Sequence, residues 1–174
     1  KALVWDTNGV LGTGAGVSAT YIFVFVLFGA FLKYSGFSQF INDIALTLVG
    51  QTPGGPAKVA VISSAAFGTI SGAAAANVVG TGTFTIPLMK KCGYPPEFAG
   101  AVEACASTGG MFTPPIMGAT AFVVAAYLGL SYVTVALAAA IPALCYYFAL
   151  FAAVDFHARK SKIPPLKKEE MPVV

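Results

Sequence analysis

Charge is scarce in this sequence. Asp, Glu, Lys and Arg together make up 10% of its 174 residues, whereas 57% of the residues are hydrophobic. A soluble domain usually carries about 25% charged residues, so the composition excludes an ordinary soluble domain. We therefore expect a membrane protein.

Cysteine and histidine are also rare. The three cysteines, Cys92, Cys105 and Cys145, form no C-x-x-C pair, and the chain has one histidine. This excludes a Cys/His metal centre, and we expect the cysteines to be reduced and structural. Because the sequence has no H-E-x-x-H motif, no P-loop and no nucleophile motif, we expect no enzyme activity.

Basic residues are few and are unevenly placed. The net charge is +3, and nine of the ten basic residues lie at the ends of apolar segments or near the C-terminus. This distribution argues against a nucleic-acid partner. No charged n-region, short apolar core and cleavage site follow one another from Lys1, so we expect no signal peptide and interpret the chain as a piece of a longer protein.

Apolar runs divide the chain into segments. We predict a membrane domain over residues 1–156 that opens with a loop over 1–16, and a cytoplasmic basic tail over 157–174. A transmembrane span needs about 20 apolar residues, and amphipathic spacing without that length favours a helix at the interface. The domain then contains a span at 17–36, an interfacial helix at 38–49, a re-entrant hairpin at 57–91, a broken helix at 97–127 and a span at 131–154 with a kink at Pro142.

The hairpin prediction follows from a length that fits no simple span. Val59 to Met89 is 31 residues without a charge, bounded by Lys58 and Lys90. One span needs about 20 residues and two need about 40. The cluster "TISGAAAANVVGTG" near its middle favours a break at residues 71–74, which predicts two half-length helices that meet inside the membrane.

The broken helix is indicated by glycine and proline. Glu97 to Leu128 is apolar apart from two acids, but "STGGMFTPP" interrupts it. Proline lacks the amide donor and clashes with the preceding turn, so we predict half-helices at 97–109 and 116–127. With a hairpin that opens on one face, nine basic residues fall on that face, which the positive-inside rule makes cytoplasmic.

Two unwound breaks inside a membrane are typical of transporter sites. Free carbonyls bind a cation and half-helix N-termini attract an anion. Hard cations take about six oxygens, so the candidate sodium ligands are the oxygens of Ser71, Gly72, Asn77, Thr108, Gly109 and Pro114. Two alternatives remain: the small residues only permit close helix packing, and Asn77 is a plain N-cap. For Ser63 and Ser64 we expect bonds to their own backbone.

Glu103 is the one charged residue between Phe98 and Val154. An acid inside a membrane is costly and marks a functional site by default. It either carries a proton, or forms a structural ion pair with Lys58 or Lys90, or reaches interfacial water. We favour the structural role. An intramembrane enzyme would need a second titratable group, which the apolar segments do not offer.

The same residues resemble a known family. The stretch "GGPAKVAVISSAAFGTISGAAAANVVGTGTFTIPLMKKCGYPPEFAGAVEACASTGGMFTPPIMGATAF", Gly54 to Phe122, resembles the large membrane (permease) subunit of TRAP transporters. It is most similar to the fused-permease branch that works with TAXI-type binding proteins. The resemblance implies an all-α inverted-repeat transporter of the elevator type, of which this chain is one repeat.

The resemblance also implies a function. Such a permease is a sodium symporter of the bacterial or archaeal cytoplasmic (inner) membrane, multi-pass, with Na⁺ as coupling ion and no other cofactor. It imports organic acids, often dicarboxylates. The implied partners are membrane lipid, an extracytoplasmic solute-binding protein, the remaining permease repeat and a small membrane subunit or domain. The implied substrate contacts are Ser71, Ala73, Thr113 and Pro115.

This sequence departs from the family pattern at two positions. Ala73 stands where the family commonly has a serine, and Met111 stands where it often has glutamine. The first change removes a hydroxyl from the hairpin tip, and the second removes a polar group. The alternative function is that of a non-transporting membrane structural or assembly subunit, whose helix breaks would be filled by packing.

Overall fold

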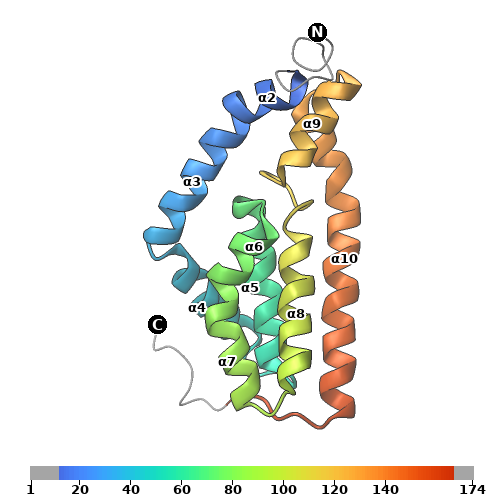
Figure 1. Cartoon of the computed structure of the whole chain (residues 1–174). Helices are drawn as coiled ribbons and strands as arrows, with labels where there is room; N and C mark the ends of the chain where they lie inside the picture. Colours follow the sequence, from blue (N-terminus) through green and yellow to red (C-terminus); the bar gives the residue numbers. More distant parts are fainter. Residues whose placement is uncertain (1–11, 167–174) are drawn as a thin grey trace.

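The computed structural model describes residues 12–166, and every regular element in that range is helical (Figure 1). The expected loop up to residue 11 and the last part of the basic tail, 167–174, lie outside the described residues. The described part is therefore an all-helical bundle, as the composition of a membrane protein predicts.

The first arm is a long helix with one π-helical turn. It consists of α2 (Thr13–Val17), η1 (Ser18–Ile22) and α3 (Phe23–Tyr34). The prediction of a loop over 1–16 is wrong for residues 13–16, which are helical because α2 packs against α9. Gly36, with φ +82°, then turns the chain into α4 (Phe37–Val49), which packs on α5.

A helical hairpin follows. Its first limb is α5 (Gly55–Ser71), and its second limb runs through α6 (Ala74–Asn77), η2 (Val78–Gly82) and α7 (Thr83–Lys91). Gly72 adopts a left-handed conformation with φ +58°, which glycine accepts without a steric penalty. The helix therefore stops at Ser71, turns at the Gly72–Ala73 pair, and starts again at Ala74.

The third unit is an interrupted helix beside a continuous one. Residues 110–118 separate α8 (Pro96–Gly109) from α9 (Ala119–Leu128). Gly129 then reverses the chain into α10 (Tyr132–Lys160), which the Ser131 hydroxyl caps by accepting a bond from the Thr134 amide (3.2 Å). Pro142 is accommodated inside α10 without ending it.

Among the described residues, α10 is the one helix that is long and apolar enough by itself to cross a membrane. It has 29 residues and is about 44 Å long, whereas the 17 residues of α5 span about 26 Å. The hairpin tip accordingly lies part of the way along α10, at the level where α8 is interrupted (Figure 1).

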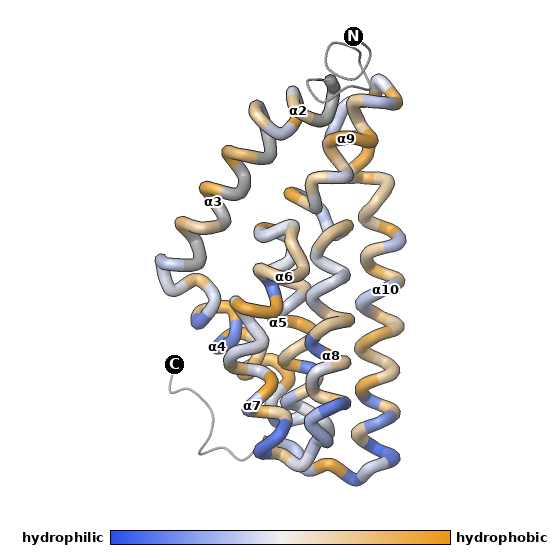
Figure 2. The backbone as a smooth tube through the Cα atoms, viewed as in Figure 1, coloured by the Kyte–Doolittle hydropathy of each residue, from blue (hydrophilic) through white to orange (hydrophobic). Residues whose placement is uncertain are grey.

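The open end of the hairpin, the start of α8 and the end of α10 lie together at one end of the bundle (Figure 1). Lys58 pairs with Asp155 of α10 at 2.5 Å, and the Tyr94 hydroxyl donates to the Gly54 carbonyl (3.3 Å). Burial raises the pKa of Tyr94 to about 12, so its hydroxyl keeps its proton and remains a donor. Figure 2 shows hydrophilic residues gathered at this end.

The sequence places the start of the basic tail too early. The last helix continues beyond Val154 to Lys160, and the His157 ring stacks on Phe98 with 3.8 Å between centroids. Beyond the helix, Ile163 and Leu166 are buried, and the Leu166 amide donates to the Gly50 carbonyl (3.2 Å). These apolar contacts order the chain where the charge pattern alone predicts a free tail.

Large apolar side chains cover the outside of α3 and α10. Their exposed fractions lie near two thirds, as for Phe31 (69%), Ile141 (71%) and Phe148 (77%). Soluble monomers rarely expose such continuous apolar surface, so these faces belong against lipid or against other apolar helices. The buried core lies between the hairpin, α8 and the second half of α10.

Candidate functional site

The hairpin tip and the interruption between α8 and α9 are in backbone contact. The Ile116 amide donates to the Thr69 carbonyl (3.1 Å). A Cβ atom added to Gly72 would lie 1.9 Å from the Met117 carbonyl oxygen, closer than any side chain permits. Two stretches of unwound backbone, nearly fifty residues apart in sequence, thus form one structural unit.

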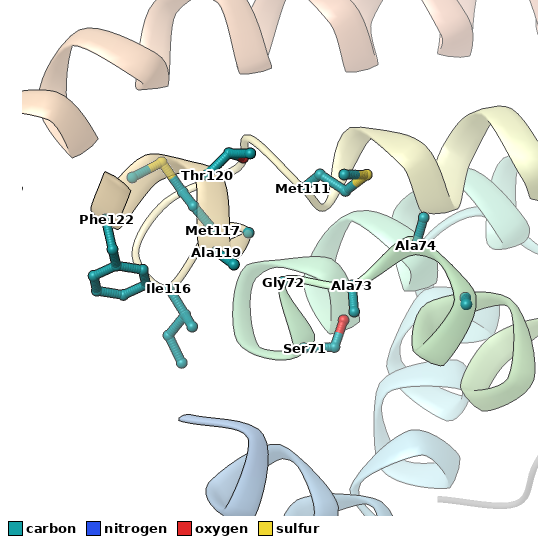
Figure 3. Close-up of a pocket in the computed structure, with 12 residues that line it drawn as sticks. Ser71, Gly72, Ala73, Ala74, Met111, Ile116, Met117, Ala119, Thr120 and Phe122 are labelled. Carbon is teal, nitrogen blue, oxygen red and sulfur yellow. The ribbon is translucent and has the colours of Figure 1, made fainter. Parts of the chain in front are cut away.

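A cavity of about 440 Å³ opens where these two stretches meet (Figure 3). The hairpin tip lines one side of it, and the 111–122 segment lines the other. The lining residues are Ser71, Gly72, Ala73, Ala74, Ala75, Met111, Ile116, Met117, Gly118, Ala119, Thr120 and Phe122. The Ser71 hydroxyl oxygen is buried and has no hydrogen-bond partner, so the cavity offers one polar group that nothing in the described chain satisfies.

None of the residues that line this cavity carries a formal charge. The first two residues of α9, Ala119 and Thr120, border it, and the N-terminus of a helix carries a partial positive charge. The electrostatic character of this cavity therefore comes from backbone amides and carbonyls and from uncharged hydroxyl groups.

The structure separates the sequence-predicted ligands into groups. Ser71, Gly72 and Ala73 line the cavity. Thr108 is exposed and donates to the Ala104 carbonyl (2.7 Å) within its own helix. Gly109 faces α10 instead, since a Cβ atom there would lie 2.7 Å from the Tyr147 hydroxyl oxygen.

The remaining predicted residues of the 110–118 segment face α10. The Thr113 hydroxyl donates to the Gly109 carbonyl (2.7 Å), which occupies an oxygen proposed for the cation. Pro114 lines a second cavity of about 490 Å³ between α5 and α10. The Pro115 carbonyl accepts a hydrogen bond from Tyr132 (2.8 Å), whose hydroxyl also donates to the Ile116 carbonyl.

Asn77 is not an N-cap. The helix restarts at Ala74, so Asn77 lies one turn inside it, and its side chain is fully buried. Its amide nitrogen donates to the Ser64 carbonyl across the hairpin (2.8 Å), and its side-chain oxygen lies 3.3 Å from the Thr81 hydroxyl oxygen. Asn77 therefore joins the two limbs of the hairpin and does not line the cavity at its tip.

A second polar centre lies deeper between the hairpin and α8. Glu103 has no exposed surface. One carboxylate oxygen accepts bonds from Ser64 (2.9 Å), Thr81 (2.6 Å) and Ser107 (3.1 Å), and the other accepts from Thr85 (2.5 Å). We call Glu103 and these four hydroxyl residues the Glu103 cluster. Gly82 provides its space, because a Cβ atom there would lie 3.0 Å from Cγ of Glu103.

The proposed partners of Glu103 are wrong. Lys58 pairs with Asp155 and lies 5.3 Å from the centre of the Phe151 ring, Lys90 is exposed, and Glu103 itself does not reach water. For the two serines, Ser63 donates to the Val59 carbonyl (2.7 Å) as predicted, whereas Ser64 turns toward the carboxylate.

The hydroxyl partners of Glu103 were not predicted from the sequence, although their spacing in the sequence indicates them. Thr81 and Thr85, and likewise Glu103 and Ser107, are four residues apart, and such pairs lie on one face of a helix. Two polar pairs with this spacing in otherwise apolar helices indicate a shared buried contact. Which helix faces meet is decided by tertiary packing.

Two interrupted helices that meet around a cavity in an apolar helical bundle are typical of broken-helix membrane transport proteins. The comparison with known families agrees with this class. The family model of the tripartite ATP-independent periplasmic (TRAP) transporter DctM component matches residues 7–174, so the chain belongs to this family and is a membrane protein.

Several curated proteins are similar to this chain. It is 31% identical over 144 residues to a C4-dicarboxylate TRAP transporter large permease protein of Pseudomonas aeruginosa, covering 83% of this chain and 33% of that protein. It is 32% identical over 143 residues to the corresponding protein of Vibrio cholerae, covering 80% and 30%. It is 31% identical over 100 residues to a 2,3-diketo-L-gulonate TRAP transporter large permease of Escherichia coli, covering 58% and 23%.

The chain spans about a third or less of the length of these relatives. All three are named as transporter permeases and none as an enzyme, in agreement with the absence of catalytic motifs. The family shown is thus that of a TRAP transporter component.

Proposed function

We propose that this chain is the first repeat of the transport part of a TRAP-type large permease, a sodium-coupled secondary transporter that imports organic acids. The observation that carries the proposal is the cavity between the hairpin tip and the α8–α9 interruption. Family membership and the one-third coverage of the relatives support it. A second repeat would then supply the other side of the site.

In this proposal the hairpin is re-entrant. It enters the membrane from the cytoplasmic side, and its tip stops near the midplane. The start of α5, the end of α7 and the end of α10, which carry Lys58, Lys90 and Arg159, lie together at that end of the bundle (Figure 1). The faces of α3 and α10 lie against lipid or the second repeat. The protein is multi-pass, and the hairpin and α8 move together in an elevator-type step.

Sodium binding is assigned to oxygens at the hairpin tip. Ser71 offers an unpartnered hydroxyl, and Gly72 leaves the backbone unwound there. The other four candidate ligands from sequence are engaged elsewhere, face away or line the second cavity: Asn77, Thr108, Gly109 and Pro114. We infer that the remaining oxygens come from the facing 111–118 segment and from the second repeat.

The substrate is assigned to the same cavity. Its carboxylate would face the N-terminus of α9, since the described lining has no basic side chain. Dicarboxylates fit the names of several relatives, and they would arrive from an extracytoplasmic solute-binding protein. A small membrane subunit or domain completes the transporter.

The test is sodium-dependent uptake of a radiolabelled C4-dicarboxylate by the full permease, reconstituted with its binding protein and small subunit. Ala73→Leu places a large side chain in the cavity and is expected to reduce uptake at least tenfold. Ser71→Ala removes the free hydroxyl and is expected to raise the sodium concentration needed for half-maximal uptake several-fold.

The matched control is Ala138→Leu, which adds the same side chain at an exposed position of α10 outside the cavity. It is expected to leave uptake within twofold of the wild type. Normal uptake by Ala73→Leu would reject the assigned site. Sodium-independent uptake in the wild type would reject the coupling ion and leave the cavity assignment standing. A complete transporter that takes up none of several organic acids would favour the structural subunit.

A further inference from the structure

Glu103 is buried without a basic partner. Both ion pairs among the described residues belong to Asp155, with Lys58 and with Arg159. Burying a carboxylate in an apolar interior is costly unless another group balances its charge or donates hydrogen bonds to it. The Glu103 cluster meets this requirement with four hydroxyl groups and no cation.

The ionised carboxylate is fully satisfied by these hydroxyls. An ionised carboxylate accepts about four hydrogen bonds and donates none. Ser64, Thr81, Ser107 and Thr85 each have one O–H group, and their oxygens lie 2.5–3.1 Å from the carboxylate oxygens. The shorter of these distances match charge-assisted O–H···O⁻ bonds.

The protonated carboxyl group is satisfied in the same positions. The Thr85 oxygen lies 3.1 Å from the Thr81 carbonyl, and the Thr81 oxygen lies 3.0 Å from the Asn77 carbonyl. Each threonine hydroxyl therefore has a second acceptor in its own helix. When the carboxyl group carries its one proton, one of these hydroxyls can turn to the backbone and accept from Glu103 instead of donating to it.

A metal ion does not fit between these oxygens. A hard cation such as Ca²⁺ needs each oxygen about 2.3–2.6 Å from its own centre, so it cannot sit between two oxygens that are hydrogen-bonded to each other. The hydroxyl and carboxylate oxygens of the Glu103 cluster touch directly. A proton can be added to the cluster without moving a heavy atom, because it takes the place of one O–H in an existing hydrogen bond.

We propose that Glu103 is a reversible proton-binding site between the hairpin and α8. The proton adds to the carboxylate oxygen beside Thr85, and the new O–H bond donates to the Thr85 oxygen. The Thr85 hydroxyl then turns to donate to the Thr81 carbonyl. No other bond is made or broken, and the site keeps its packing in both states.

No other titratable side chain of the described residues is hydrogen-bonded or ion-paired to the Glu103 carboxylate. Tyr147 of α10 faces α8, but its hydroxyl donates to the Ala106 carbonyl (2.8 Å). Lys58 is paired with Asp155, and the other titratable residues on α8, Glu97 and Cys105, are exposed. The other titratable residues on the elements packed against α8 are Lys90, Lys91, Tyr132, Cys145, Tyr146, His157, Arg159 and Lys160, none of which has a hydrogen bond or ion pair to the carboxylate in the described structure.

The test is infrared difference spectroscopy of the purified full permease in detergent, titrated with acid and base. A protonated carboxyl group has a C=O stretch that an ionised one lacks. We expect a band that disappears reversibly as the pH rises, that is lost in Glu103→Gln, and that persists in Glu97→Gln, the exposed control on the same helix. This readout needs no substrate or sodium, so its failure is distinct from a failure of the transport proposal.

A second pair of variants keeps Glu103 in place. Thr85→Val removes a donor to the ionised form, so the pH at which the band disappears is expected to differ from that of the wild type. Thr85→Ser retains the hydroxyl and is expected to match the wild type. If Glu103→Gln fails to fold, the comparison of Thr85→Val with Thr85→Ser tests the proton-binding site instead. A titrating band unchanged by every Glu103 and Thr85 variant, or no titrating carboxyl band at all, overturns the proposal.

Discussion

Gly68 of α5 and Gly110 at the end of α8 touch backbone to backbone. A Cβ atom added to Gly68 would lie 2.6 Å from the Cα atom of Gly110. This contact holds the first limb of the hairpin, α5, against α8, near the end of each of these two helices. The geometry of the cavity therefore depends on two residues that have no side chains.

Gly68→Ala is expected to destabilise the protein by about 1–3 kcal/mol, because the new methyl group must displace backbone rather than a flexible side chain. The measurement is the melting temperature of the purified protein in detergent. The control is Gly100→Ala on α8, where a Cβ atom meets nothing within 4 Å. Equal melting temperatures for the two variants would contradict the close contact.

Gly72→Ala is expected to abolish uptake by distorting the hairpin tip. The added methyl group would lie 1.9 Å from the Met117 carbonyl oxygen, in addition to the strain of φ +58°. Gly129→Ala separates these two causes. Gly129 has φ +62° with open space around it, so this variant has the strain, about 1–2 kcal/mol, without the collision. We expect Gly129→Ala to retain uptake, and equal losses in both variants would show that backbone strain alone is responsible.

The Lys58–Asp155 pair predicts an asymmetry between its two partners. Asp155→Asn leaves the ammonium group of Lys58, a residue that is 4% exposed, without an anion. Lys58→Met leaves Asp155 with Arg159 at 2.7 Å. A buried charge without a partner is the more costly outcome, so we expect a larger drop in melting temperature for Asp155→Asn. Lys90→Met, an exposed position, is the control, and the reverse order of the first two variants would contradict the burial of Lys58.

Asn77 and Ser71 are expected to respond in opposite ways. Asn77→Ala removes a buried donor to the Ser64 carbonyl, so it should destabilise the protein by about 1–3 kcal/mol and leave the sodium dependence of uptake unchanged. Ser71→Ala should change the sodium dependence and leave the melting temperature within about one degree of the wild type. If Asn77→Ala raised the sodium concentration needed for uptake and kept normal stability, Asn77 would be a sodium ligand, which would contradict its structural assignment.

The helix interruptions were accessible from sequence because glycine and proline act locally. Ser71–Gly72 and the "GGMFTPP" run disfavour a regular helix in any environment, and the structure has unwound backbone at both places. The surroundings of Asn77 and Glu103 were not accessible. Their partners lie on other helices, up to 39 residues away, and depend on which helix faces meet.

The sequence by itself determined that this protein is apolar and helical, that two of its helices are interrupted, and that its basic residues gather at the ends of apolar segments. Each of these properties follows from composition or from local backbone preference. Tertiary structure decided that the two interruptions share a cavity, that Lys58 pairs with Asp155, and that four hydroxyls surround Glu103. Such contacts depend on the packing of helices that are distant in sequence, which no local pattern specifies.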